Sequence, residues 1–147
     1  MTILIYLWQF PQYILGALFS TIWTRCLELK DLRKVKLKRY AEAHICIVSA
    51  ESHRRHKWLS LVSGVSFGPY ICLNDENDEN DIRHELGHSI QSLYLGPLYL
   101  AIAGIPSVCN NVWDRRFHKR WTPRDRIRWY YSRFPENWAD KLGGVNR

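Results

Sequence analysis

A long apolar stretch, residues 3–23, opens the chain and contains no charged side chain. As an α-helix rising 1.5 Å per residue it would reach about 31 Å, close to the roughly 30 Å hydrocarbon core of a bilayer. Gln9, Pro11 and Gln12 interrupt the stretch, and Pro11 would remove a helical hydrogen bond. A kinked membrane span, a shallow hairpin and an interfacial helix are therefore all open, beside a buried helix of an ordinary soluble domain.

Two later segments have the composition of β-strands. Residues 40–50 alternate imperfectly between apolar and polar side chains and are rich in β-prone types. Residues 61–73 carry Val, Phe, Tyr and Ile around Gly64 and Gly68, which predicts a strand that bends at its glycines. The polar residues between these two segments, 53–58, are predicted to form a turn that exposes its two histidines.

Helical patterns dominate the second half of the chain. One helix is predicted from about 82 to 95, with its N-cap at Asn80 or Asp81 and its end at Gly96-Pro97. A second apolar stretch at 98–108 is broken by glycine and proline, and it fits either a buried helix or a segment lying partly in a membrane. A last helix is expected at 134–142, which with the two strands predicts an α+β fold with a short β-sheet.

Positive charge follows the N-terminal apolar stretch directly. Residues 25–39 contain seven Arg or Lys against two acidic side chains, and the whole chain has a formal net charge of +7. Basic residues beside an apolar segment mark the cytoplasmic side of a membrane and favour anionic lipid head groups, although a solvated helix face has the same composition. We predict a membrane-associated apolar helix at 1–24 and a second unit at 25–147 on the cytoplasmic side.

The four cysteines are spread along the chain, at Cys26, Cys46, Cys72 and Cys109. They form no C-x-x-C pair, and the chain is longer and poorer in cysteine than a disulfide-stapled secreted module. We interpret them as free thiols in a reducing compartment, and their spacing does not favour a structural zinc site.

The string His84-Glu85-Leu86-Gly87-His88 fits the H-E-x-x-H pattern. Residues four apart share one helix face, so His84 and His88 can bind one tetrahedral metal ion through ring nitrogens. Glu85 projects beside that face and can take a proton from a water molecule on the metal. Two surface histidines on a helix are the alternative, but the pattern favours a Zn²⁺ site with Glu85 as the catalytic base.

A catalytic zinc site with an open position needs a third protein ligand. The string Glu136-Asn137-Trp138-Ala139-Asp140 offers two carboxylates four residues apart on the last predicted helix. Glu136 is our predicted third ligand, and Asp140 is predicted to hydrogen-bond the far nitrogen of a ligand histidine. Asp140 and His118 are the rival third ligands.

The two strings H-E-L-G-H and E-N-W-A-D resemble the gluzincin metallopeptidases, of which thermolysin is a familiar member. Residues 64–144 also resemble a group of small bacterial proteins with an H-E-x-G-H motif. The resemblance implies a small zincin-like domain that hydrolyses peptide bonds, with one motif helix and a second ligand helix. In gluzincins a strand before the motif helix pairs with the peptide substrate, and residues 64–73 are its counterpart here.

An enzyme of this kind also needs a group that stabilises the developing oxyanion. Tyr130, Tyr131, Arg133 and His118 are available, and Tyr131 is our choice. We thus predict a zinc metallopeptidase that acts on peptide or protein substrates at a membrane and contacts lipid.

Two alternative functions are also open. The first is a zinc-binding membrane protein without catalysis. The second is a basic nucleic-acid-binding protein, because residues 113–133 interleave cations with tryptophan as single-strand-binding grooves do. The same composition also suits anionic lipid, and no nucleic-acid-binding motif is present, so a nucleic-acid partner is not expected.

Overall fold

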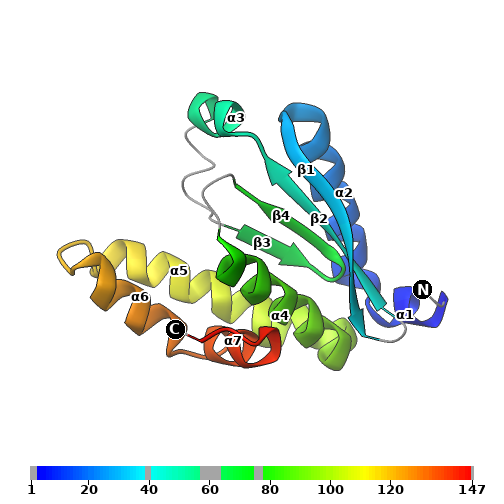
Figure 1. Ribbon diagram of the computed structural model, residues 1–147. Coiled ribbons are helices and arrows are strands. Elements are labelled where there is room, and N and C mark those ends of the chain that lie inside the picture. The colour runs from blue at the N-terminus through cyan, green and yellow to red at the C-terminus, as the bar shows by residue number, and fades with distance from the viewer. Residues whose placement is uncertain (1–2, 39–40, 57–63, 75–77, 147) are drawn as a thin grey trace.

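The computed structural model describes residues 3–38, 41–56, 64–74 and 78–146. It has four strands and a larger set of helices, which confirms the predicted α+β class (Figure 1). The strands form one sheet in the order β1-β2-β4-β3, so β3 lies at one edge and β1 at the other.

The sheet is mixed. Strand β1 (Leu29–Lys38) pairs antiparallel with β2 (Ala41–Val48), and β2 pairs in parallel with β4 (Tyr70–Leu73). Strand β3 (Gly64–Phe67) forms an antiparallel hairpin with β4. Because a parallel pair cannot be joined by a tight turn, the chain crosses from β2 to β3 before it returns through β4.

The two faces of the sheet are covered by different helices. On β4, Cys72 packs in one cluster with Trp23 of helix α2 (Phe10–Cys26), whereas its neighbours Ile71 and Leu73 pack in a second cluster with Ile82 of helix α4 (Glu79–Leu95). Successive side chains of a strand point to opposite faces, so α2 and α4 cover opposite sides of the sheet (Figure 1).

The N-terminal apolar stretch forms two helices. Helix α1 (Ile3–Trp8) ends at Trp8, and Gln9 is the N-cap of α2, which has Pro11 in its first turn, where the missing N–H of proline costs least. The predicted single helix at 1–24 is thus broken at Gln9. Among the described residues, none of the helices is long and apolar enough to cross a membrane.

Helix α4 begins three residues earlier than predicted. Its N-cap is Asp78, whose carboxylate accepts a hydrogen bond from the backbone N–H of Asp81, while the Asp81 side chain accepts one from the N–H of Asp78. This reciprocal capping box, rather than a cap at Asn80 or Asp81, starts the helix. The predicted end is confirmed, because Gly96 follows Leu95 with φ of +54°.

The chain beyond Gly96 folds into further helical elements. A 3₁₀ turn and a π-helical turn lead into α5, which forms a hairpin with α6 before α7 returns against α4 (Figure 1). The bounds are Gly96–Leu98 for the 3₁₀ turn, Leu100–Gly104 for the π-helical turn, Ile105–Phe117 for α5, Pro123–Tyr131 for α6 and Glu136–Gly143 for α7.

Three local predictions were wrong. Most of the basic run 25–39 is the edge strand β1, so the alternative of a solvated helix face is wrong; the partner strand β2 supplies hydrogen bonds that the pattern of charges does not reveal. The polar turn predicted at 53–58 overlaps helix α3 (Ala50–Arg55), capped by Ser49. The bent strand predicted at 61–73 is the hairpin β3–β4, since Gly68 adopts φ of +59° and turns the chain back; residues 57–63 lie outside the described part.

Candidate metal centre

Helix α4 carries the H-E-x-x-H residues in its buried middle. His84, Glu85 and His88 are 4%, 8% and 6% exposed, so the alternative of two surface histidines is wrong. All three follow the capping box of Asp78 and Asp81 and lie on buried turns of the helix. One face of α4 therefore presents two imidazoles inward.

Helix α7 brings the second acidic pair to the same place. Glu136 is in its first turn and fully buried, and Asp140 is one turn further on. The two helices can approach closely because Gly87 of α4 faces the backbone of Ala139, and Gly143 of α7 faces the backbone of Arg83. Glycine at both positions lets the helices pack backbone to backbone.

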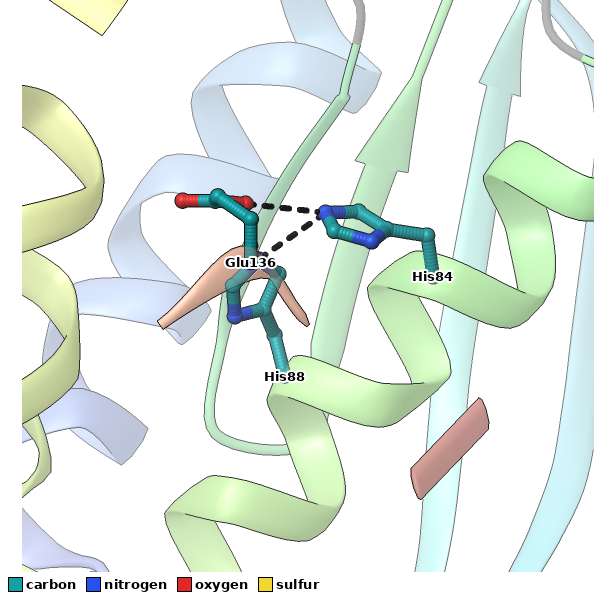
Figure 2. A group of neighbouring side chains, drawn as sticks. All are labelled: His84, His88 and Glu136. Atoms are coloured by element: carbon teal, nitrogen blue, oxygen red, sulfur yellow. Dashed lines mark hydrogen bonds and ion pairs between the residues drawn. The ribbon is translucent and has the colours of Figure 1, made fainter. Parts of the chain in front are cut away.

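Three ligand atoms meet between these helices (Figure 2). The Nε2 atoms of His84 and His88 are 3.1 Å apart, and Glu136 Oε2 lies 3.1 Å from the first and 3.2 Å from the second. A tetrahedral ion with ligands at about 2.05 Å would separate them by about 3.3 Å. The three side chains therefore have the spacing of one face of a metal coordination tetrahedron and could hold a metal ion.

The outer nitrogens of both histidines donate to oxygen atoms. His84 Nδ1 donates to Asp140 Oδ1 at 2.7 Å, and His88 Nδ1 donates to Gln91 Oε1 at 2.8 Å. Gln91 is fixed in this orientation because its Nε2 donates to the carbonyl of Pro135 at 2.9 Å. With Nδ1 protonated, each Nε2 has a lone pair, so two nitrogen lone pairs and a carboxylate oxygen converge and require a cation or a proton between them.

The electrostatics of the metal-free site agree with this arrangement. Burial lowers the pKa of His84, but its hydrogen bonds to Asp140 and Glu136 outweigh burial and raise that pKa to about 9. Burial alone would raise the pKa of Glu136, yet the hydrogen bonds from His84 and His88 hold it well below its usual range. A proton on the imidazole thus occupies part of the place that a metal ion would take.

A cavity of about 270 Å³ opens beside the three ligand atoms. Its wall includes the three ligand side chains, Glu85, the whole of β3, and residues of α5 and α6, among them Tyr130 and Tyr131. Glu85 Oε2 is buried and has no hydrogen-bond partner among the described residues. Gly64 leaves room for this carboxylate, because a Cβ there would lie 2.7 Å from Glu85 Oε1.

The other predicted site residues lie in different surroundings. Asp140 supports His84 from behind, as predicted, and is not in the group of three. His118, a rival third ligand, donates from Nδ1 to Asp114 at 3.1 Å and stacks on Trp121, outside that group. The Tyr131 ring meets the His84 ring edge to face at 5.0 Å and also lines the cavity.

Sequence reasoning gave no role to Gln91, and it named Tyr130 only as one of four available oxyanion stabilisers. Gln91 orients His88 and ties it to α7, and its position three residues after His88 on the same helix face was the available signal. Tyr130 lines the cavity beside Tyr131, and burial and the negative charge of Glu136 raise the pKa of its hydroxyl. A hydroxyl that stays protonated can donate a hydrogen bond into the cavity.

Comparison of the chain with protein-family models, with curated protein sequences and with solved structures finds no match.

Proposed function

We propose that the protein is a zinc-dependent metallopeptidase in which His84, His88 and Glu136 hold the ion and Glu85 is the general base. The near-equilateral triangle of Nε2, Nε2 and Oε2 atoms beside an open cavity carries this proposal. Three protein ligands next to a cavity suit a catalytic zinc site, whereas a structural zinc site is closed by four. Two imidazoles with one carboxylate form a donor set typical of catalytic Zn²⁺.

The chemistry follows from the side chains around the cavity. A bound zinc ion would acidify a water molecule and polarise the scissile carbonyl. Glu85 accepts the proton of the attacking water, since its Oε2 is free of protein hydrogen bonds among the described residues, and then delivers that proton to the leaving amine. Asp140 and Gln91 keep both histidines in the Nδ1–H form that leaves Nε2 available to the metal.

The oxyanion stabiliser is assigned to a tyrosine of α6. Tyr131 is retained as our choice because its ring lies against His84, and Tyr130 is the rival because its protonated hydroxyl shares the cavity. Tyr131→Phe and Tyr130→Phe should each retain zinc. The tyrosine that stabilises the transition state should lower kcat by about 10²- to 10³-fold when its hydroxyl is removed.

An extended peptide is the proposed substrate. All four residues of the edge strand β3 line the cavity, and an edge strand offers backbone hydrogen bonds to an added strand. This is also the role that the gluzincin resemblance gives to residues 64–73. The enzyme is proposed to act at a membrane, with the unit 25–147 on the cytoplasmic side.

The test is a comparison of Glu85→Gln with Glu79→Gln. Glu79 is on the same helix but pairs with Arg83 at the surface, so it is a matched control. Both variants should bind one zinc ion per chain, whereas only Glu85→Gln should lose cleavage of a quenched-fluorescent peptide library. Zinc binding without cleavage by the wild type would favour the non-catalytic zinc-binding alternative, and absence of zinc would refute the proposal.

A further inference from the structure

Helix α2 turns polar and small side chains towards the protein interior and large apolar side chains outward, the reverse of a surface helix in a soluble protein. Its sheet-facing side carries Gln12, Gly16 and Ser20 together with Trp23. The large apolar side chains point outward and are 41–62% exposed, namely Phe10, Ile14, Leu15, Leu18 and Ile22. Monomeric soluble proteins rarely expose so continuous an apolar face, so this surface meets something apolar.

A second apolar stripe runs along the outer side of the segment from the 3₁₀ turn to the end of α5. Its members are 39–61% exposed and recur with a mostly helical spacing, namely Leu98, Ile102, Ile105, Val112, Trp113 and Phe117. The inner side of α5 instead faces the cavity with Ser107 and Asn111. The same helix therefore separates the cavity from an exposed apolar surface.

The two stripes meet at Trp8. Its indole N–H donates to the carbonyl of Leu93 at 2.9 Å, and its ring packs on Gly96, where a Cβ would lie 2.7 Å from Trp8 Cδ2. Gln12 also donates to the carbonyl of Gly96 at 2.8 Å. Since Leu98 begins the second stripe two residues later, the N-terminal helices and the α5 segment form one extended apolar region.

Positive charge is concentrated beside this region. Residues 113–133, the end of α5 and helix α6, carry eight Arg or Lys against two Asp, which accounts for +6 of the net charge of +7. One of the two acids, Asp114, is buried and already paired with Arg126 and His118. The tip of the α5–α6 hairpin (Figure 1) carries three exposed cations, Arg116, Lys119 and Arg120. Two exposed tryptophans, Trp113 and Trp121, are close to them in sequence.

We propose that the outer faces of α1, α2 and α5, with the cationic α5–α6 tip, bind the interface of an anionic lipid bilayer. Apolar stripes, tryptophans at their border and flanking Arg and Lys are the three features of helices that lie in a membrane interface. The apolar area excludes nucleic acid as the main partner, because phosphate recognition would leave these side chains in water. The cations attract anionic head groups, each contributing to affinity near the surface.

Docking in this way orients the metal centre. Val108 lines the cavity and is also 62% exposed, next to Ile105 and Val112 on α5. The cavity therefore opens at the border of the lipid-facing surface. If the proposed peptidase activity holds, on which this last step rests, its substrates are peptide segments held at the membrane surface.

Vesicle flotation of the metal-free full chain tests the surface independently of zinc and catalysis. Wild type should bind vesicles of phosphatidylcholine with 30% phosphatidylglycerol at least tenfold more tightly than pure phosphatidylcholine vesicles. Ile105→Glu/Val112→Glu should lower binding at least tenfold. Leu32→Glu should not, because Leu32 is equally exposed at 64% but lies on the edge strand β1. Arg116→Glu/Lys119→Glu/Arg120→Glu should abolish the preference for anionic lipid.

Several outcomes would overturn the inference. The inference is wrong if the wild type floats with neither kind of vesicle. It is also wrong if Leu32→Glu loses as much vesicle binding as Ile105→Glu/Val112→Glu does. The surface would instead bind a second copy of the chain if the wild type binds no vesicles, sediments as a dimer, and becomes a monomer in Ile105→Glu/Val112→Glu. Salt-sensitive binding to single-stranded RNA without vesicle binding would assign the cationic tip to nucleic acid. Loss of peptidase activity alone would leave the flotation result unchanged.

Discussion

Gly87 allows the helix packing behind the metal centre to be tested with a single methyl group. In Gly87→Ala the new Cβ would lie 2.7 Å from the Ala139 carbonyl carbon and 3.0 Å from Ala139 Cα, and closer still to the carbonyl oxygen. Carbon atoms pack at about 3.5–4.0 Å, so α7 must move by about 1 Å. Backbone atoms cannot rotate away as a flexible side chain would.

Two opposing effects determine how much Gly87→Ala changes the free energy of unfolding. Alanine is intrinsically better than glycine inside a helix by about 1 kcal/mol, so a site with free space would be stabilised. Overpacking against backbone costs about 1–3 kcal/mol or more, and here it dominates. Metal–ligand distances tolerate only about 0.2 Å, so a displacement of about 1 Å at Ala139 should also carry Glu136, three residues earlier, out of zinc-binding range.

The assay pairs urea unfolding with chelator competition for zinc. Gly87→Ala should lower the free energy of unfolding and weaken zinc binding by about 100-fold or more. Gly104→Ala is the matched control, because the nearest atom to its Cβ would be Leu100 Cδ2 at 3.6 Å, an ordinary contact. It should be neutral or slightly stabilised, with zinc affinity within about twofold. A Gly87→Ala protein as stable as wild type, with the same zinc affinity, would refute the reasoning about the α4–α7 contact.

Four further predictions concern the ligand His84 and the residues behind the ligands. Asp140→Asn removes the carboxylate that accepts from His84 at 2.7 Å and should weaken zinc binding about 10- to 100-fold in the same competition assay. Gln91→Met keeps the side-chain length but loses both hydrogen bonds, so zinc affinity should fall about tenfold or more, and no change would remove Gln91 from the centre. The proton on metal-free His84, with its pKa raised to about 9, must leave when zinc binds, so zinc affinity should fall by up to tenfold per pH unit below about 9. Because that pKa is raised above its ordinary value of 6.5, metal-free protein should be stabilised below pH 6.5 and lose this contribution as the pH rises to about 9; urea unfolding curves that do not change across this window would contradict it.

The pattern of residue types along the chain predicted the features of the structure that depend on contacts between residues close in sequence. The spacing of His84 and His88 and the end of the helix at Gly96 depend on residues within a few positions of each other, so they could be predicted. The placement of Glu136 in the first turn of a late helix followed from the same kind of local signal at Pro135. The α+β class rested on the same periodicities.

Local patterns did not determine which strands and helices meet. The basic run became the edge strand β1 because β2 lies beside it, and no charge pattern encodes that partner. The N-terminal stretch reads as an apolar segment with a few polar interruptions, and only the tertiary structure reveals that Gln12 and Ser20 turn inward while Leu15 and Leu18 turn outward.

The sequence by itself determined that two imidazoles and a carboxylate base would share one helix, because helical geometry places residues four apart on one face. It favoured Glu136 over the rivals Asp140 and His118 as the third ligand, but it could not place any of the three beside the histidines, since all lie 30 or more positions further along the chain. The tertiary structure decided that Glu136 joins the two histidines, that Asp140 and Gln91 orient them, and that His118 pairs with Asp114 instead. The physical reason is the close approach of α4 and α7 through Gly87 and Gly143, which brings their side chains together across a long separation in the chain.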